Sequence, residues 1–171
     1  KQSINMKKTI VLLMITGLFS AFTACAQRPS PPAKVSETTS AGVKITVDYS
    51  QPAVKGRTIG KEIAPFGQVW RTGANEATWM EVSKDVKVEG KALKAGRYGI
   101  WTIPGEKEWT IIFNSKSNIS GTEYSEADDV MRVVVKPGKS ASFSERMTFK
   151  IAKTGVVSLI WGDHQVNFNV K

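Results

Sequence analysis

From Val43 to Lys171, apolar and polar residues alternate in short runs. Residues 43–49 read Val-Lys-Ile-Thr-Val-Asp-Tyr, and residues 166–170 read Val-Asn-Phe-Asn-Val. A period of two is typical of strands that bury one face. The pattern predicts the remaining strands over residues 68–72, 77–83, 85–89, 97–103, 108–114, 130–136, 146–153 and 156–161.

Turn-forming residues separate these runs, and Gly162-Asp163 suits a two-residue hairpin loop. Residues 58–66 and 122–129 are expected to be short helical or irregular turns. Ten short strands in one chain predict an all-β fold, a single antiparallel β-sandwich or jelly-roll-like domain over residues 43–171. Among the aromatic residues within the predicted strands are six, most of which are expected in the core: Trp79, Trp101, Trp109, Phe113, Phe149 and Trp161.

The first 24 residues have the pattern of an export signal. Lys7 and Lys8 precede an uncharged run over residues 9–24, which is shorter than the roughly 20 residues that span a bilayer as a helix. We expect residues 1–24 to be a leader, in which residues 6–24 are the signal peptide. Residues 1–5 precede the first Met and are expected to be upstream read-through.

The leader ends in Phe22-Thr23-Ala24-Cys25, which resembles the lipobox of bacterial lipoproteins. The resemblance implies cleavage before Cys25, a lipid on its thiol and therefore a membrane partner. Ala26 follows, as in lipoproteins released to the outer membrane, so the resemblance places the protein there, facing the periplasm or the cell surface. The alternative is an ordinary secretory signal cut after Ala24 or Ala26. Residues 25–42 are rich in Pro, Ser and Thr, which predicts a flexible, solvated tether after the anchored cysteine.

Charge and composition exclude several classes of function. The formal net charge is +9, but basic and acidic residues interleave, which predicts a solvated mixed surface and no nucleic-acid partner. Cys25 and His164 are the single cysteine and the single histidine. They exclude an intrachain disulfide, a Cys/His zinc finger and a Cys–His catalytic pair in the mature domain. We expect neither a metal nor a cofactor.

The connection over residues 65–78 carries the candidate ligand-binding residues Trp70, Arg71, Asn75 and Glu76. A guanidinium offers a rigid fork of donors to a carboxylate, a phosphate or sugar hydroxyls, and an indole offers a flat face to a sugar ring or a cation. The alternative is architectural. In that interpretation Arg71 and Glu76 form an internal ion pair, Trp70 belongs to the core, and Gly73 supplies a positive φ.

Together with residues 49–57, this connection closely resembles the bacterial domain of unknown function family 2911. The likeness continues through residues 83–86, 90–98, 102–105 and 109–114, and it covers essentially all of residues 43–171. It implies a secreted or lipid-anchored β-sandwich domain whose biochemical activity is not established. One departure is Ser120-Gly121, where similar proteins commonly carry a Trp-Gly pair.

These features favour an envelope lipoprotein that is a noncatalytic binding module for a glycan, a peptidoglycan fragment or an envelope protein. A glycan or ester hydrolase is one alternative, with Glu76 paired to Glu81, Asp48 or Asp163. Glycoside cleavage needs two carboxylates about 5–9.5 Å apart, whereas residues 76 and 81 would lie on opposite faces of a regular strand. A metal-assisted hydrolase would recruit Asp163 and His164. A purely structural or assembly role is the third hypothesis. We predict that the protein is not an enzyme.

Overall fold

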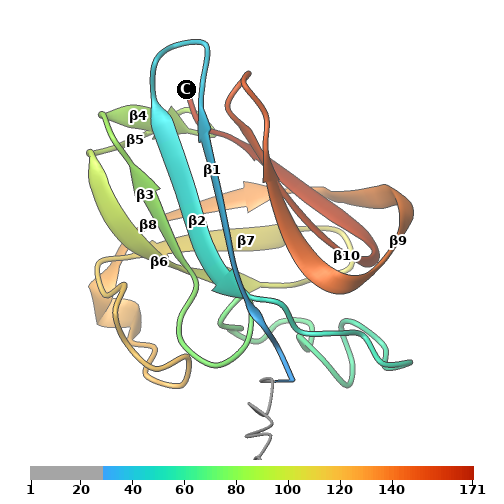
Figure 1. Ribbon diagram of the computed structural model, residues 1–171. Helices are drawn as coiled ribbons and strands as arrows, with labels where there is room; N and C mark the ends of the chain where they lie inside the picture. The colour runs from blue at the N-terminus through green and yellow to red at the C-terminus, as the bar shows by residue number, and fades with distance from the viewer. Residues whose placement is uncertain (1–28) are drawn as a thin grey trace, which may run out of the picture.

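Strands account for nearly all of the regular structure in the computed structural model, which describes residues 29–171 (Figure 1). One short 3-10 helix, η1 (Glu126–Asp128), precedes β8. The strands are β1 (Pro32–Thr38), β2 (Lys44–Ser50), β3 (Trp79–Val82), β4 (Val86–Val88), β5 (Lys91–Leu93), β6 (Gly96–Ile103), β7 (Trp109–Asn114), β8 (Asp129–Val135), β9 (Pro137–Ile151) and β10 (Val156–Asn169).

Six strands form one antiparallel sheet in the order β1-β2-β3-β6-β7-β8. β9 and β10 pair as a long antiparallel ribbon, and β4 pairs with β5 as a short hairpin. Figure 1 shows the ribbon on the right of the molecule, beside β1. The predicted all-β antiparallel sandwich is therefore confirmed.

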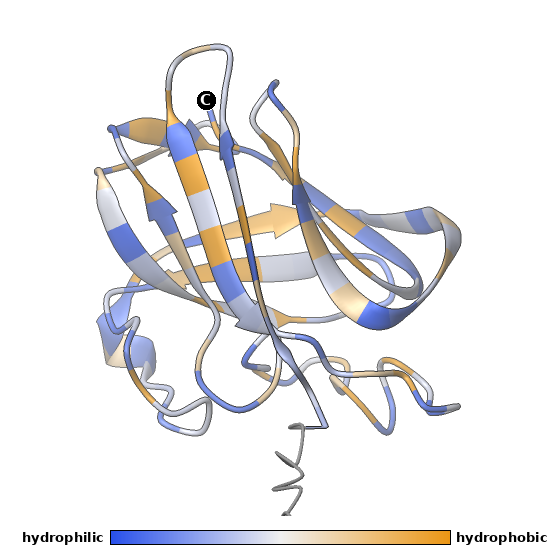
Figure 2. Ribbon diagram, in the orientation of Figure 1, coloured by the Kyte–Doolittle hydropathy of each residue, from blue (hydrophilic) through white to orange (hydrophobic). Residues whose placement is uncertain are grey.

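The core lies between the sheet and the ribbon because each contributes the apolar half of its alternating pattern. Figure 2 shows this alternation as hydrophobic and hydrophilic bands along β2. From the sheet, Ile45, Met80 and Phe113 are fully buried, and from the ribbon Leu159 and Phe168 meet them in the same cluster. A smaller cluster around Trp101 and Ile112 lies apart from this main core.

The expected tether is wrong over residues 32–38, which form β1. Every residue of β1 pairs with β2, from Pro32 opposite Ser50 to Thr38 opposite Lys44. Ala33 and Val35 pack against the core, while Pro32, Lys34, Ser36 and Thr38 alternate with the partly buried positions and are exposed. A polar composition is compatible with an edge strand because such a strand needs little apolar surface and gains its hydrogen bonds from its neighbour. The folded domain thus begins before Val43, and the leader and Cys25 lie outside the described residues.

The predicted hairpin at Gly162-Asp163 is also wrong, because β10 continues through it. Gly162 has a φ of +57°, and the pairing with β9 shifts register on both sides of it. The glycine therefore forms a bulge that bends the strand without reversing it. The predicted strand over residues 68–72 is reduced to an isolated bridge between Trp70 and Thr102.

Most of the predicted core aromatics are buried, and Trp79 is the exception. It is half-buried on the outer face of the sheet, because its neighbours Met80 and Val82 take the inward positions of β3. The irregular turns expected over residues 58–66 and 122–129 are confirmed, with η1 as a single turn in the second. Within residues 29–171, no helix has the length and apolar character needed to cross a bilayer.

Candidate functional site

A cleft of about 400 Å³ lies where the long connection between β2 and β3 folds against the sandwich. Figure 1 shows this connection at the lower end of the molecule. Trp70, Arg71 and Asn75 all line the cleft, together with Arg57 and Trp161. The structure thus brings three of the four predicted ligand-binding residues into one concavity.

Trp70 forms part of the aromatic wall of the cleft. Its ring stacks on Trp161 with centroids 5.2 Å apart and planes 9° from parallel, and it meets Trp109 edge-on at 6.4 Å. Reciprocal backbone hydrogen bonds with Thr102, of 2.7 and 2.9 Å, fix its main chain. Trp70 packs against the core and is half-buried. Trp70 is therefore partly a core residue, because Trp161 covers one face of its ring. It is also a cleft residue, because the rest of the side chain is only half-buried.

Arg71 is half-buried, and its guanidinium makes no hydrogen bond or ion pair with another residue of the described chain. Its stem runs over Gly121, where an added Cβ would lie 2.5 Å from Arg71 Cδ and 2.5 Å from the carbonyl oxygen of Asn75. Glycine at position 121 is therefore required for this path of the arginine. The internal ion pair with Glu76 does not form among residues 29–171.

Asn75 lines both the cleft and a neighbouring hollow, whereas Glu76 lines only the hollow. Asn75 Nδ2 donates to the carbonyl oxygen of Ser30 and to Ser50 Oγ, both at 3.2 Å, so its carboxamide anchors the loop. Glu76 is bridged to Ser120 through the backbone and lines a neighbouring hollow that also contains Glu123. Glu76 is therefore beside the cleft and not among the residues that line it.

Unusual backbone conformations gather around the cleft. Three of the five non-glycine residues with positive φ in the described chain are Ala64 at +47°, Thr72 at +52° and Asn75 at +62°. The buried Thr72 is held there because its backbone carbonyl oxygen accepts from Thr78 Oγ1 at 2.8 Å. Such conformations cost about 1–3 kcal/mol each and cluster at functional sites. The predicted positive φ at Gly73 is wrong. That glycine is needed because a Cβ would lie 2.8 Å from Thr78 Oγ1.

The charge of the cleft is positive. Arg57 and Arg71 line it, and the part of the chain that the structure describes contributes no acidic residue to its lining. Arg57 is held in place by its own loop, since Nε donates to Val54 O at 3.1 Å and Nη2 to Ala53 O at 2.8 Å. The cleft can therefore attract an anion through two guanidinium groups, and residues 29–171 occupy none of the five donors of Arg71.

The carboxylates of the hydrolase hypothesis are spread over the molecule. On the outer face of the sheet, Glu81 Oε2 forms an ion pair with Arg97 Nη2 at 2.7 Å. On the same face, Asp48 Oδ2 forms an ion pair with Lys34 Nζ at 3.6 Å. Asp163 is exposed on β10. The structure instead places Glu123 in the hollow that Glu76 lines. Over residues 29–171, no group of three or more His, Cys, Asp and Glu side chains is arranged to hold a metal ion.

Sequence reasoning missed Arg57 and Trp161 as cleft residues. Arg57 stands in the segment 49–57 that carried the family resemblance, so that segment held a usable signal. Trp161 gave no such signal, because its strand pattern indicated only burial. Its indole nitrogen is indeed buried, and it has no hydrogen-bond partner within the described chain.

Comparisons with known proteins give one match. The family model described as "Protein of unknown function (DUF2911)" matches residues 30–170, which include β1 and every residue of the cleft. The comparison with curated proteins and the comparison with solved structures gave no match. On this match and the β-sandwich described above, the chain belongs to the DUF2911 family of proteins of unknown function.

Proposed function

We propose that the domain is a noncatalytic binding module whose cleft takes the carboxylate of a peptidoglycan fragment or a similar acidic glycan. The observation that carries this proposal is Arg71, a half-buried arginine in a cleft without acidic lining residues and without an acceptor in the described chain. Removing a guanidinium from bulk water is unfavourable unless an acceptor replaces the water. A bound carboxylate supplies that acceptor.

The aromatic wall supports the same ligand class. The half-buried Trp70 presents apolar surface beside the donors of Arg71, and the buried Trp161 supports its ring from behind. Sugar rings combine apolar faces with polar edges, so they match a wall of this composition. The cleft volume of about 400 Å³ lies within the roughly 300–1,000 Å³ of sites for small ligands.

We also propose that the protein is an outer-membrane lipoprotein anchored through a lipid on Cys25. The support is the basic and apolar leader and the lipobox-like Phe22–Cys25 of the sequence. Several acyl chains, at about 0.8 kcal/mol per buried methylene, would hold the protein on the membrane. Metabolic labelling with a radioactive fatty acid should mark the wild-type chain and not Cys25→Ser. Label retained by Cys25→Ser would contradict the anchor.

Isothermal titration tests the cleft. The titrants are a peptidoglycan disaccharide tripeptide and the same compound with methyl-esterified carboxylates. Hydrogen bonds to charged groups contribute roughly 1.5–3 kcal/mol. Arg71→Ala should therefore lower the affinity for the unesterified compound about 10- to 100-fold. Arg71→Lys keeps the charge but loses the fork, and should give an intermediate affinity. Lys61→Ala, an exposed cation outside the lining of the cleft, is the matched control and should bind like the wild type.

Unchanged affinity in a folded Arg71→Ala protein would refute the assigned site. Equal affinity for the acid and its ester would refute the role of the carboxylate. Release of a shortened product, abolished by Glu76→Gln, would replace the binding module with the hydrolase hypothesis. No affinity for either titrant, with a protein partner that co-purifies stably, would favour the assembly role.

A further inference from the structure

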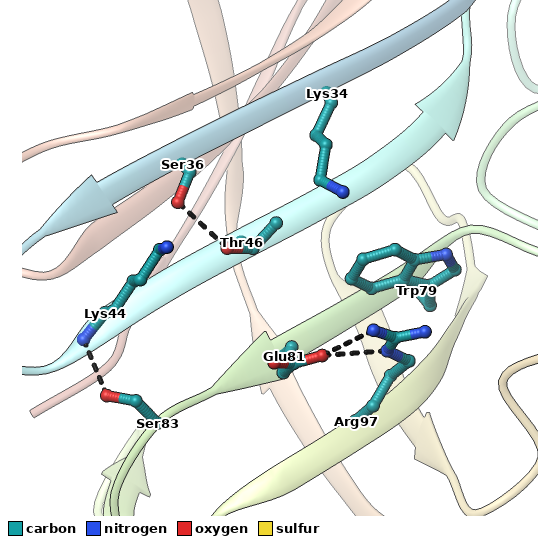
Figure 3. Close-up of a pocket in the computed structure, with 8 residues that line it drawn as sticks. All are labelled: Lys34, Ser36, Lys44, Thr46, Trp79, Glu81, Ser83 and Arg97. Atoms are coloured by element: carbon teal, nitrogen blue, oxygen red, sulfur yellow. Dashed lines mark hydrogen bonds and ion pairs between the residues drawn. The ribbon is translucent and has the colours of Figure 1, made fainter.

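A second concavity, of about 250 Å³, lies on the outer face of the six-stranded sheet (Figure 3). We call it the outer-sheet groove. It shares no lining residue with the cleft. Its lining side chains come from β1, β2, β3 and β6 and from the residue after β3, and they are Lys34, Ser36, Lys44, Thr46, Trp79, Glu81, Ser83 and Arg97.

The strand register arranges the floor of the groove as one polar row. Ser36 lies opposite Thr46, Thr46 opposite Glu81, and Glu81 opposite Arg97. Neighbouring strands are about 4.8 Å apart, so this row extends roughly 14 Å across four strands. Ser36 Oγ and Thr46 Oγ1 are 2.9 Å apart and share a hydrogen bond. The floor therefore offers hydroxyl and carboxylate groups in a line perpendicular to the strands.

One wall is an indole held between two cations. The Arg97 guanidinium lies 3.9 Å from the centre of the Trp79 ring, and Lys34 Nζ lies 5.1 Å from it. In Figure 3, Lys34 lies above Trp79 and Arg97 below it. Arg97 donates Nε and Nη2 to Glu81 Oε2 at 2.8 and 2.7 Å, which fixes the guanidinium. Because its neighbours hold it, this wall is ordered before any ligand arrives.

The opposite wall has unused hydrogen-bonding capacity. The backbone N–H of Lys44 donates to Ser83 Oγ at 2.9 Å, which leaves the hydroxyl proton of Ser83 available to a ligand. The Lys44 ammonium has no hydrogen bond or ion pair with any residue of the described chain, whereas Lys34 and Arg97 each have a carboxylate partner. Lys44 is therefore the cation of the groove whose charge is not already paired.

We propose that the outer-sheet groove binds an acidic polysaccharide, laid across β1, β2, β3 and β6. Lys44 takes a carboxylate of the chain. The hydroxyls of Ser36, Thr46 and Ser83 and the free oxygen of Glu81 exchange hydrogen bonds with sugar hydroxyls, and Trp79 contacts a ring through the part that its cations leave open. This site goes beyond the proposed function, because none of its residues belongs to the cleft.

The test uses the full-length chain and three probes: tetragalacturonate, its methyl ester and inorganic phosphate. The indole resonance of Trp79, assigned with Trp79→Phe, reports occupancy of the groove by NMR. Tetragalacturonate should shift this resonance and bind at least tenfold more tightly than the ester, while phosphate alone should leave the resonance in place. An exposed charge pair contributes about 0.2–1 kcal/mol, so Lys44→Ala should weaken binding roughly 1.4- to fivefold. Lys44→Glu adds repulsion and should weaken it more than about tenfold.

Two controls separate this site from the cleft. Lys61→Ala removes an exposed cation elsewhere and should leave the Trp79 titration unchanged, and so should Arg71→Ala. Wild-type affinity in folded Lys44→Ala and Lys44→Glu proteins would overturn the proposal, as would a tetragalacturonate complex in which the Trp79 resonance does not move. Loss of binding in Arg71→Ala but not in Lys44→Glu would assign the ligand to the cleft and overturn the groove.

Discussion

Tyr49 joins the two layers of the sandwich through a hydrogen bond from the backbone of Phe149, which makes Tyr49→Phe a sharp test of the packing. The residue lies on β2 and is 6% exposed. Its Oη accepts from the backbone N–H of Phe149 on β9 at 3.0 Å. Its ring meets the Phe149 ring edge-on with centroids 5.0 Å apart. The substitution keeps this ring contact and removes the acceptor that Tyr49 supplies to a buried donor.

The expected loss follows from that donor. A buried N–H left without a partner costs about 1–3 kcal/mol. For a domain of this size, each kcal/mol lowers Tm by roughly 2–4 °C, so Tyr49→Phe should lower Tm by about 2–12 °C. Tyr98→Phe is the matched control, because it removes the same hydroxyl group from another tyrosine. Its hydroxyl donates to Lys94 O at 2.9 Å in an exposed contact that water replaces, so the change should stay within about 0.5 kcal/mol.

Urea denaturation of the wild type and both variants measures these differences, and its pH dependence adds a second readout. Burial raises the pKa of Tyr49 above its usual 10.0. Above pH 10 the unfolded chain releases this proton while the folded chain retains it, so wild-type stability falls as pH rises. Tyr49→Phe should remove that component of the fall. Equal losses in Tyr49→Phe and Tyr98→Phe, or an unchanged alkaline fall in Tyr49→Phe, would refute the reasoning.

Three further predictions follow from the same structure. Gly155→Ala should destabilise the fold about 1–3 kcal/mol more than Gly56→Ala in urea melts: both glycines have positive φ, but a Cβ at 155 would collide with Val170 O, whereas a Cβ at 56 meets open space. Burial and the hydrogen bond to Asp129 raise the pKa of Tyr124 to about 12, so a spectrophotometric titration should lose a step near pH 12 in Tyr124→Phe. Gly121→Ala should displace Arg71 and lower the affinity for the peptidoglycan fragment in the isothermal titration of the cleft. Wild-type affinity would show that binding does not depend on the path of Arg71.

The alternation of apolar and polar residues was enough to predict the fold class and most strands, because burial of one face is recorded in the order of residues. It failed where structure depends on a distant partner. Residues 32–38 have the composition of a tether, and the free edge of β2 makes them a strand. A glycine such as Gly162 suits a hairpin and a bulge equally, and only the continued pairing of β9 decides for the bulge.

The candidate site divides in the same way. Trp70, Arg71 and Asn75 stand close together in the sequence, so their chemistry was visible there, whereas Trp161 reaches the cleft only through the packing of β10. The position of Trp79 was predictable and was missed. Met80 and Val82 point inward, so Trp79 and Glu81, two residues apart, must share the outer face.

The two proposed sites rest on different physics. Arg71 is half-buried without an acceptor in the described chain, and the backbone beside it is strained at Thr72. The half-burial of Arg71 and the strain at Thr72 both oppose folding, and a bound anion would offset the cost of burying Arg71. Lys44 is exposed, so the outer-sheet groove imposes no comparable desolvation, and its support is the placement of polar groups on four adjacent strands. It follows that Arg71→Met, which removes a half-buried charge, should preserve or increase stability while it weakens anion binding in the cleft about as much as Arg71→Ala does. Lys44→Met should leave stability nearly unchanged. Lower stability in Arg71→Met would show that the arginine supports the fold, and the cleft would then lose its main argument for function.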